Sequence, residues 1–236
     1  MKIISLVSSR PGTGQTTVAV NLGAGLVGKG LKVLICNLNS SKNLYNWLGV
    51  QVKEETSVSL TPDLPVIKNY IYASELGIDV LYLGSHPTAT PFQSDEVMKI
   101  IQDLSYDYLI LNPGGRLEDL IIAAQLADNV IACTDLNGDD VLRRLERLQK
   151  EMIHLSDGRR GVNLILPCKI NINKWENNAN GLFAIGDYFG YEKIADLIPN
   201  DHRIHPLRTN GKTVWELQNT SLRDAFSRLL ERVECL

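Results

Sequence analysis

Short, almost continuously apolar runs alternate with amphipathic stretches along this sequence, and this alternation limits the folds that the chain can adopt. The apolar runs predict buried strands at 2–7, 31–36, 80–83, 108–111, 129–133 and 162–166. Helices are expected between them, at 16–29, 95–104, 117–126 and 139–155. Such strands are covered on both faces, and a regular succession of strand and helix requires parallel pairing with right-handed crossovers. The sequence therefore predicts an α/β fold with a doubly wound, mostly parallel sheet flanked by helices.

The composition is typical of one domain spanning residues 1–236. Hydrophobic residues make up 44% of the chain and charged residues 22%, which suits a large core and argues against disorder. No apolar run reaches the roughly 18 residues of a membrane-spanning helix, and the opening residues are too short for a signal peptide. We therefore expect a cytoplasmic protein. The net charge of −3 argues against a protein that coats nucleic acid, and the wide spacing of the four cysteines argues against a zinc site.

A glycine-rich loop follows the first predicted strand, with the sequence Ser9-Arg10-Pro11-Gly12-Thr13-Gly14-Gln15-Thr16-Thr17. At the carboxyl end of a parallel strand, such a loop and the helix after it direct backbone N–H groups at an anion. Gly12 and Gly14 allow a phosphate to approach closely, and Thr16 offers a hydroxyl to a metal ion. The phosphate-loop pattern G-x-x-x-x-G-K-[S/T] has Ser9 in place of its first glycine and Gln15 in place of its lysine. A plain glycine-rich turn is the alternative to a phosphate site.

The loop resembles the deviant Walker A motif of the ParA/MinD family, which reads roughly K-G-G-x-G-K-T-[S/T]. Arg10 stands at the signature lysine of that motif and Gln15 at its P-loop lysine. Asn37 and Asn39 resemble the D-x-D switch segment, and Asn112 ends a strand that resembles the one carrying the Walker B-type aspartate. The stretches 198–201 and 210–214 resemble the CpaE/TadZ branch, whose members act in pilus assembly and localisation.

This resemblance implies a P-loop NTPase fold, ATP or ADP with Mg²⁺ as the cofactor, Thr16 as a metal ligand, and a homodimer. It also implies that the nucleotide is bound by Arg10, Pro11, Gly12, Thr13, Gly14, Gln15, Thr16, Thr17, Asn173, Pro199, Asn200 and Asp201.

The positions that carry catalytic charge in the family are altered in this chain, namely Arg10, Gln15, Asn37, Asn39 and Asn112. Carboxamides keep the size of aspartate and its capacity for hydrogen bonding but not its charge. Phosphoryl transfer depends on charge stabilisation, and Mg²⁺ prefers anionic oxygen ligands. We therefore assign no catalytic residue and expect no appreciable hydrolysis, while weakened ATP or ADP binding through the backbone remains compatible with the loop.

The leading hypothesis is a positioning or assembly protein that acts by partner binding and self-association, in the cytoplasm or recruited to the membrane or a cell pole. Its partner would be a protein of a positioning or pilus-type machinery. One competing hypothesis is an active ATPase that cycles between monomer and ATP-sandwich dimer, in pilus, flagellum, division-site or plasmid positioning. Another is a structural pseudo-ATPase that dimerises without a ligand. Contact with DNA or membrane is not favoured, because Arg143, Arg147 and Lys150 fit a solvated helix face and the amphipathic segment 222–233 fits a closing helix packed on the sheet.

Overall fold

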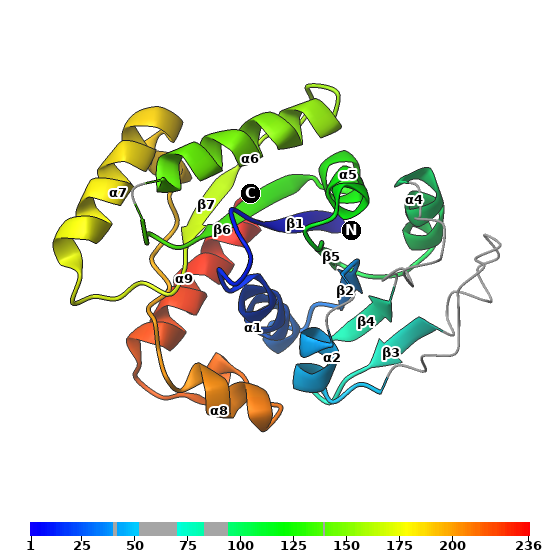
Figure 1. Ribbon diagram of the computed structural model, residues 1–236. Helices are drawn as coiled ribbons and strands as arrows, with labels where there is room; N and C mark the ends of the chain where they lie inside the picture. Colours follow the sequence, from blue (N-terminus) through cyan, green and yellow to red (C-terminus); the bar gives the residue numbers. More distant parts are fainter. Residues whose placement is uncertain (40–41, 52–69, 83–93, 139) are drawn as a thin grey trace.

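The computed structural model describes residues 1–39, 42–51, 70–82, 94–138 and 140–236. Within these residues, a seven-stranded sheet has the strand order β3-β4-β2-β5-β1-β6-β7 (Figure 1). The strands are β1 (Lys2–Ser8), β2 (Val33–Asn37), β3 (Ile71–Ala73), β4 (Asp79–Tyr82), β5 (Tyr108–Asn112), β6 (Asn129–Thr134) and β7 (Leu164–Pro167). Neighbouring strands are parallel except for β3 and β4, which pair antiparallel at one edge. The predicted doubly wound, mostly parallel sheet is confirmed.

Helices cover both faces of this sheet. The α-helices are α1 (Gln15–Gly28), α2 (Asn43–Leu48), α4 (Ser94–Gln102), α5 (Leu117–Leu126), α6 (Val141–Leu155), α7 (Trp175–Phe189), α8 (Ile204–Thr209) and α9 (Ser221–Glu234), with 3-10 turns η2 (Tyr191–Lys193) and η3 (Val214–Glu216). Helices α1 and α9 lie against one face, and α4, α5 and α6 lie against the other (Figure 1).

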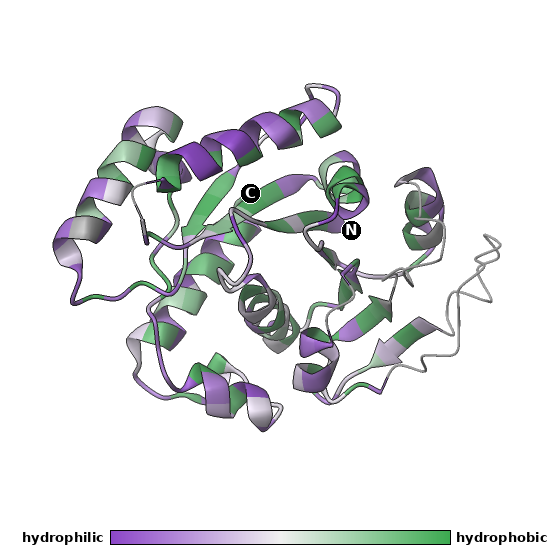
Figure 2. Ribbon diagram, in the orientation of Figure 1, coloured by the Kyte–Doolittle hydropathy of each residue, from purple (hydrophilic) through white to green (hydrophobic). Residues whose placement is uncertain are grey.

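Strand β1 shows why a continuous apolar run suits this position. Its side chains alternate between the two faces, so that Ile4 and Leu6 pack in the core beneath α1 and α9. Ile3 and Val7 belong to the cores on the opposite face. Both sets are buried, which requires apolar residues at successive positions. Figure 2 shows the same pattern as hydrophobic strands at the centre and a hydrophilic outer surface on α6.

The closing helix α9 packs on the sheet as its amphipathic sequence predicts. Thr220 caps the helix by accepting a hydrogen bond from the backbone N–H of Arg223. Phe226 and Leu229 on its inner face are 1% exposed, and burying a side chain of this size contributes about 1.5–3 kcal/mol. Neither α9 nor any other helix in the described part of the chain has the length and apolar character needed to cross a membrane.

The sequence misses some elements and shifts the ends of others. Strand β2 begins at Val33 rather than at residue 31, because Lys32 is exposed and its backbone N–H bonds the Asp107 carboxylate. The edge strand β3 and helices α2, α7 and α8 are not predicted. Strand β3 and helices α2 and α8 are too short to show a clear periodicity of apolar residues. Leu83 and Asp139, at the ends of a predicted strand and helix, lie outside the described residues.

Candidate functional site

Three adjacent strands, β1, β5 and β2, have their carboxyl ends at the glycine-rich loop. Ser8 ends β1, and Asn37 and Asn112 end the neighbouring strands β2 and β5, where they are register partners. The loop then turns into α1, with Gly12 and Gly14 in the left-handed region at φ 82 and φ 105. Gly14 is the N-cap of α1 and has no side chain to satisfy the first N–H groups of the helix. This edge of the sheet therefore has the backbone geometry of an anion site.

A cavity of about 930 Å³ opens over the loop. Seven of the eight predicted loop positions line it, together with Asn39. They are Arg10, Pro11, Gly12, Gly14, Gln15, Thr16 and Thr17. Residues that the sequence does not single out as site residues also line it, namely Asn43, Trp47, Arg116, Asp119, Arg144, Arg147, Glu151, Lys169 and Arg208. The eighth loop position, Thr13, is fully buried and does not line the cavity.

Three of the altered positions, Gln15, Asn112 and Asn37, form one chain of side-chain hydrogen bonds below this cavity. The Gln15 amide nitrogen donates to Asn112 Oδ1 at 3.0 Å and to the Pro113 carbonyl at 2.7 Å. The Asn112 amide nitrogen donates to Asn37 Oδ1 at 2.8 Å, and that of Asn37 donates to the Tyr45 hydroxyl at 2.7 Å. At the other end, the chain is extended by two hydroxyl groups, because Thr13 donates to Ser8 and Ser8 donates to Gln15 Oε1 at 2.6 Å.

The side chains of this hydrogen-bonded network are not suited to hold Mg²⁺. The side-chain oxygens of Gln15, Asn37 and Asn112 each already accept a hydrogen bond from a neighbour in the chain. Asn37 and Asn112 have no exposed surface. Mg²⁺ is bound through carboxylates, and no group of three or more His, Cys, Asp or Glu side chains in the described ranges is arranged to hold a metal ion. Thr16, the expected metal ligand, lines the cavity, but the side chains of the neighbouring network are amides rather than carboxylates.

Arg10 forms an ion pair inside its own chain. Its Nε donates to Asp135 Oδ2 at 2.9 Å and its Nη2 donates to Asp135 Oδ1 at 2.8 Å, a two-bonded geometry that orients the guanidinium. Asp135 follows β6 and its side chain is 7% exposed. The residue at the position of the signature lysine is thus held by a buried carboxylate of its own chain.

One carboxylate that the sequence analysis missed lies at the edge of the cavity. Asp119, 3% exposed, accepts bonds from Arg116 Nη2 at 2.6 Å and from the backbone N–H of Gly114 at 3.2 Å. A Cβ on Gly114 would lie 2.6 Å from Asp119 Oδ2 and 2.9 Å from Asn39 Cβ, so only glycine fits there. The (i, i+3) spacing of Arg116 and Asp119 in the sequence is typical of an ion pair on one face of a helix and would have indicated this pair.

A second cavity of about 260 Å³ adjoins the first. The predicted residues Pro199, Asn200 and Asp201 line it, and Gly14, Thr17, Lys169 and Arg208 line both cavities. A bridge between Ile170 and Pro199 holds the turn against the end of the sheet.

Asn173 is not brought to either of these cavities. It is exposed ahead of α7, and its backbone N–H bonds Asn171 Oδ1 at 3.0 Å. Its expected part in nucleotide binding therefore stays a prediction that the lining of these two cavities does not support. The reason is that the chain turns away from the loop after Ile170 and enters α7, which packs with α6.

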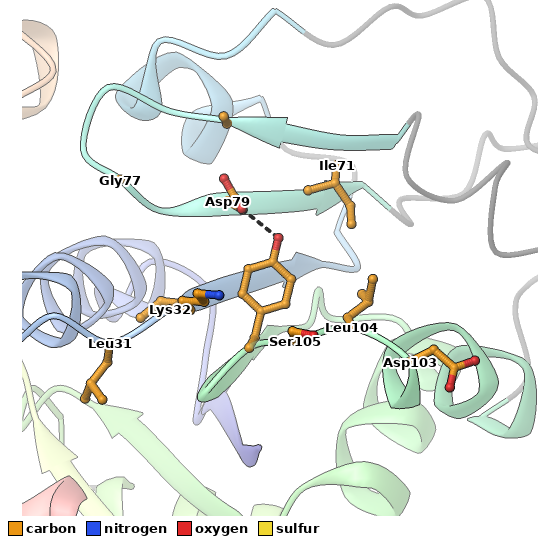
Figure 3. A pocket seen from close by; sticks show the side chains of 11 residues that line it. Leu31, Lys32, Ile71, Gly77, Asp79, Asp103, Leu104 and Ser105 are labelled. Carbon is orange, nitrogen blue, oxygen red and sulfur yellow. Dashed lines mark hydrogen bonds between the residues drawn. The ribbon is translucent and has the colours of Figure 1, made fainter.

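A third cavity, of about 680 Å³, lies near the amino ends of β2 and β4, at the other end of the strands from the loop (Figure 3). Leu31 and Lys32 border it before β2 begins, and Asp79 stands at the start of β4. The Tyr106 hydroxyl donates to Asp79 at 2.6 Å, and burial together with this bond raises the pKa of Tyr106. Because ligands of parallel sheets bind at the carboxyl ends of strands, the loop cavity is the better candidate site.

Residues 1–155 match the AAA_31 family, which is described as an AAA domain. The match covers well over half of the chain and contains the loop and the amide chain. The chain belongs to this family. Residues 156–236, which supply Lys169, Arg208 and most of the lining of the second cavity, lie beyond the matched part.

Two relatives are similar in sequence. An uncharacterized ATP-binding protein from Methanocaldococcus jannaschii is 31% identical over 133 residues, which are 54% of this chain and 50% of that protein. The match thus spans about half the length of that relative. The sporulation initiation inhibitor protein Soj from Bacillus subtilis is 25% identical over 233 residues, 90% of each chain.

Two solved structures have the same fold. The MinD of an Aquifex aeolicus MinC:MinD cell division complex aligns with a TM-score of 0.80 at 19% identity, over all of this chain and 96% of that one. MinD from Pyrococcus horikoshii, solved with Mg-ADP, aligns with a TM-score of 0.78 at 22% identity, over 99% of this chain and 96% of that one. The family match and these likenesses confirm the predicted ParA/MinD resemblance and the P-loop fold.

Proposed function

We propose that this chain, residues 1–236 folding as one domain, is a ParA/MinD-like positioning or assembly protein that does not hydrolyse ATP. It acts by binding a protein partner and by self-association, in the cytoplasm or at a membrane or cell pole to which it is recruited. Among ParA/MinD proteins, the segments at 198–201 and 210–214 favour the CpaE/TadZ branch and its pilus-type machinery.

The amide chain Gln15–Asn112–Asn37 is the observation that carries this proposal. Hydrolysis needs a cation on the phosphates and carboxylates that hold Mg²⁺, and losing one such group costs orders of magnitude in rate. Here neutral side chains occupy all three positions and satisfy one another. A neutral network avoids the cost of a buried unpaired charge, so the site is stable without nucleotide or metal.

Support for partner binding and positioning comes from the relatives. One MinD of this fold was solved in a complex with MinC, and Soj is named as an inhibitor of sporulation initiation. The ATP-binding relative and the MinD solved with Mg-ADP support residual nucleotide binding at the loop.

Phosphate release from ATP by the purified chain tests the proposal. We expect a rate no higher than that of heat-denatured protein, with an active P-loop ATPase run in parallel as the positive control. Gln15→Lys alone should not restore turnover, because the carboxylates are still missing. Turnover like that of the positive control, abolished by Thr16→Ala, would instead establish the competing function of an ATPase that cycles between monomer and dimer.

A further inference from the structure

We propose that Lys169 and Arg208 supply the positive charge for the phosphates of a nucleoside polyphosphate that binds here without Mg²⁺. This inference rests on the proposed function, in which the loop keeps a ligand but no longer hydrolyses it. It replaces the missing charge of the loop lysine with two side chains from the C-terminal third of the chain.

The position of these two residues is the first argument. The loop cavity and the smaller cavity at the Pro199 turn share four lining residues, namely Gly14, Thr17, Lys169 and Arg208. A ligand with its base in the smaller cavity and its phosphates over the start of α1 therefore passes Lys169 and Arg208, which line both cavities. The smaller cavity has apolar walls from Val18, Ile198 and Ile204, which suit a base.

The charge of the cavity is the second argument. Arg10, Arg116 and Arg144 each pair with a carboxylate, on Asp135, Asp119 and again Asp135. Across the part of the chain that the structure describes, no such ion pair involves Arg147, Lys169 or Arg208. Glu151 also lines the cavity, but the three cations outnumber it, so the cavity holds an excess of positive charge, as a phosphate ligand requires.

The backbone of Lys169 is the third argument. Lys169 has φ 56, a left-handed conformation that is unfavourable for a residue with a Cβ. Backbone bonds hold it on both sides, from the Cys168 N–H to the Thr134 carbonyl at 2.6 Å and from the Ile170 N–H to the Ile198 carbonyl at 3.0 Å. A conformation of this kind, maintained by its surroundings, is typical of functional positions.

Arg208 is placed by the packing of α8 beside α2. Its Nη2 donates to Asn43 Oδ1 at 3.0 Å, across 165 residues of sequence. Since Gln15 is committed to Asn112 and Pro113, it has no amide hydrogen left for a phosphate. Of the three cations without an ion pair, Lys169 and Arg208 are the two that line both cavities, and they are exposed, so they are placed to contact a phosphate chain as charged donors.

Calorimetric titration of the full chain with ATP tests this inference. We expect the same affinity, within about twofold, in Mg²⁺ and in EDTA. Lys169→Gln and Arg208→Gln should each weaken ATP binding by about tenfold or more, which is the loss of one charge-assisted contact. Lys150→Gln is the matched control, because it removes the same charge from an exposed site on α6 that lines neither cavity. It should change the affinity by less than about twofold.

Two further ligands separate phosphate contacts from base contacts. Tripolyphosphate should lose affinity in both variants as ATP does, while adenosine should not. Thermal unfolding of each variant should match that of the parent chain, because both side chains are exposed. The inference is overturned if ATP does not bind, if binding falls tenfold in EDTA, or if both variants behave like Lys150→Gln. None of those results requires hydrolysis, so the proposed function is tested separately by phosphate release.

Discussion

Gln15 and Asn112 show how a loop can lose its charge and still be well ordered. The two amides are 3.0 Å apart, and Asn112 is fully buried. Asn112→Asp alone should lower the free energy of unfolding by about 3 kcal/mol or more, because it buries an unpaired carboxylate beside Asn37 Oδ1. Gln15→Lys alone should lower it by about 1–3 kcal/mol, because the ammonium has no counter-charge in the amide chain.

The two changes made together should cost less than their sum, by at least about 1 kcal/mol, because each then supplies the charge that the other lacks. Urea unfolding of the parent, both single variants and the double variant measures this coupling. Asn129→Asp combined with Gln15→Lys is the control, since Asn129 is the first residue of β6 and lies at the amino ends of the strands, away from the loop. That pair should be additive within about 0.5 kcal/mol. Additivity of Gln15→Lys with Asn112→Asp would contradict the view that the amide chain replaces a charged pair.

The turn after Ile198 is stabilised by its own ion pair. Arg203 Nε donates to Asp201 Oδ1 at 2.9 Å, and this bond is the main reason that the pKa of Asp201 lies below its usual range. A carboxyl whose pKa is lowered by folding adds stability above its unfolded pKa of about 3.9 and loses it as the pH falls through the folded pKa. Arg203→Gln should therefore raise the pKa of Asp201 toward its ordinary value.

This substitution should lower the free energy of unfolding only slightly at pH 6, since Arg203 is 38% exposed and solvent weakens the pair. The difference from the parent should shrink as the pH is lowered and vanish once Asp201 is protonated in both states. NMR titration of the Asp201 carboxyl and unfolding at pH 6 and at a series of acidic pH values measure these effects. Arg159→Gln, at an exposed pair with Asp157, should leave the Asp201 titration unchanged. An unshifted Asp201 in Arg203→Gln would contradict the assignment.

Self-association of the whole protein should not depend on ATP. The residues buried beneath its loop, Asn37 and Asn112, are neutral, so they add no charge that would repel a second copy, and Arg10 is already held by Asp135 of the same chain. Sedimentation velocity should give the same distribution of species with and without ATP, across a range of protein concentrations. A shift from monomer to dimer on addition of ATP is the result that would contradict this prediction.

The sequence alone determined the sheet class, the succession of strands and helices, the loop after β1 and the loss of charge at Gln15, Asn37 and Asn112. All of these are local properties, because apolar periodicity and motif spacing are read within a few residues. It did not determine which side chains meet. The bond between Gln15 and Asn112 joins residues 97 apart, and the one between Arg208 and Asn43 joins residues 165 apart.

Such contacts depend on the order of the strands and the packing of α2 on α8, which no local pattern contains. The same reason explains why Arg10 is paired with Asp135 and why Lys169, rather than Asn173, lines the cavity. Only the tertiary structure brought the carboxyl ends of β1, β2 and β5 together and thereby turned three separate amides into one hydrogen-bonded chain.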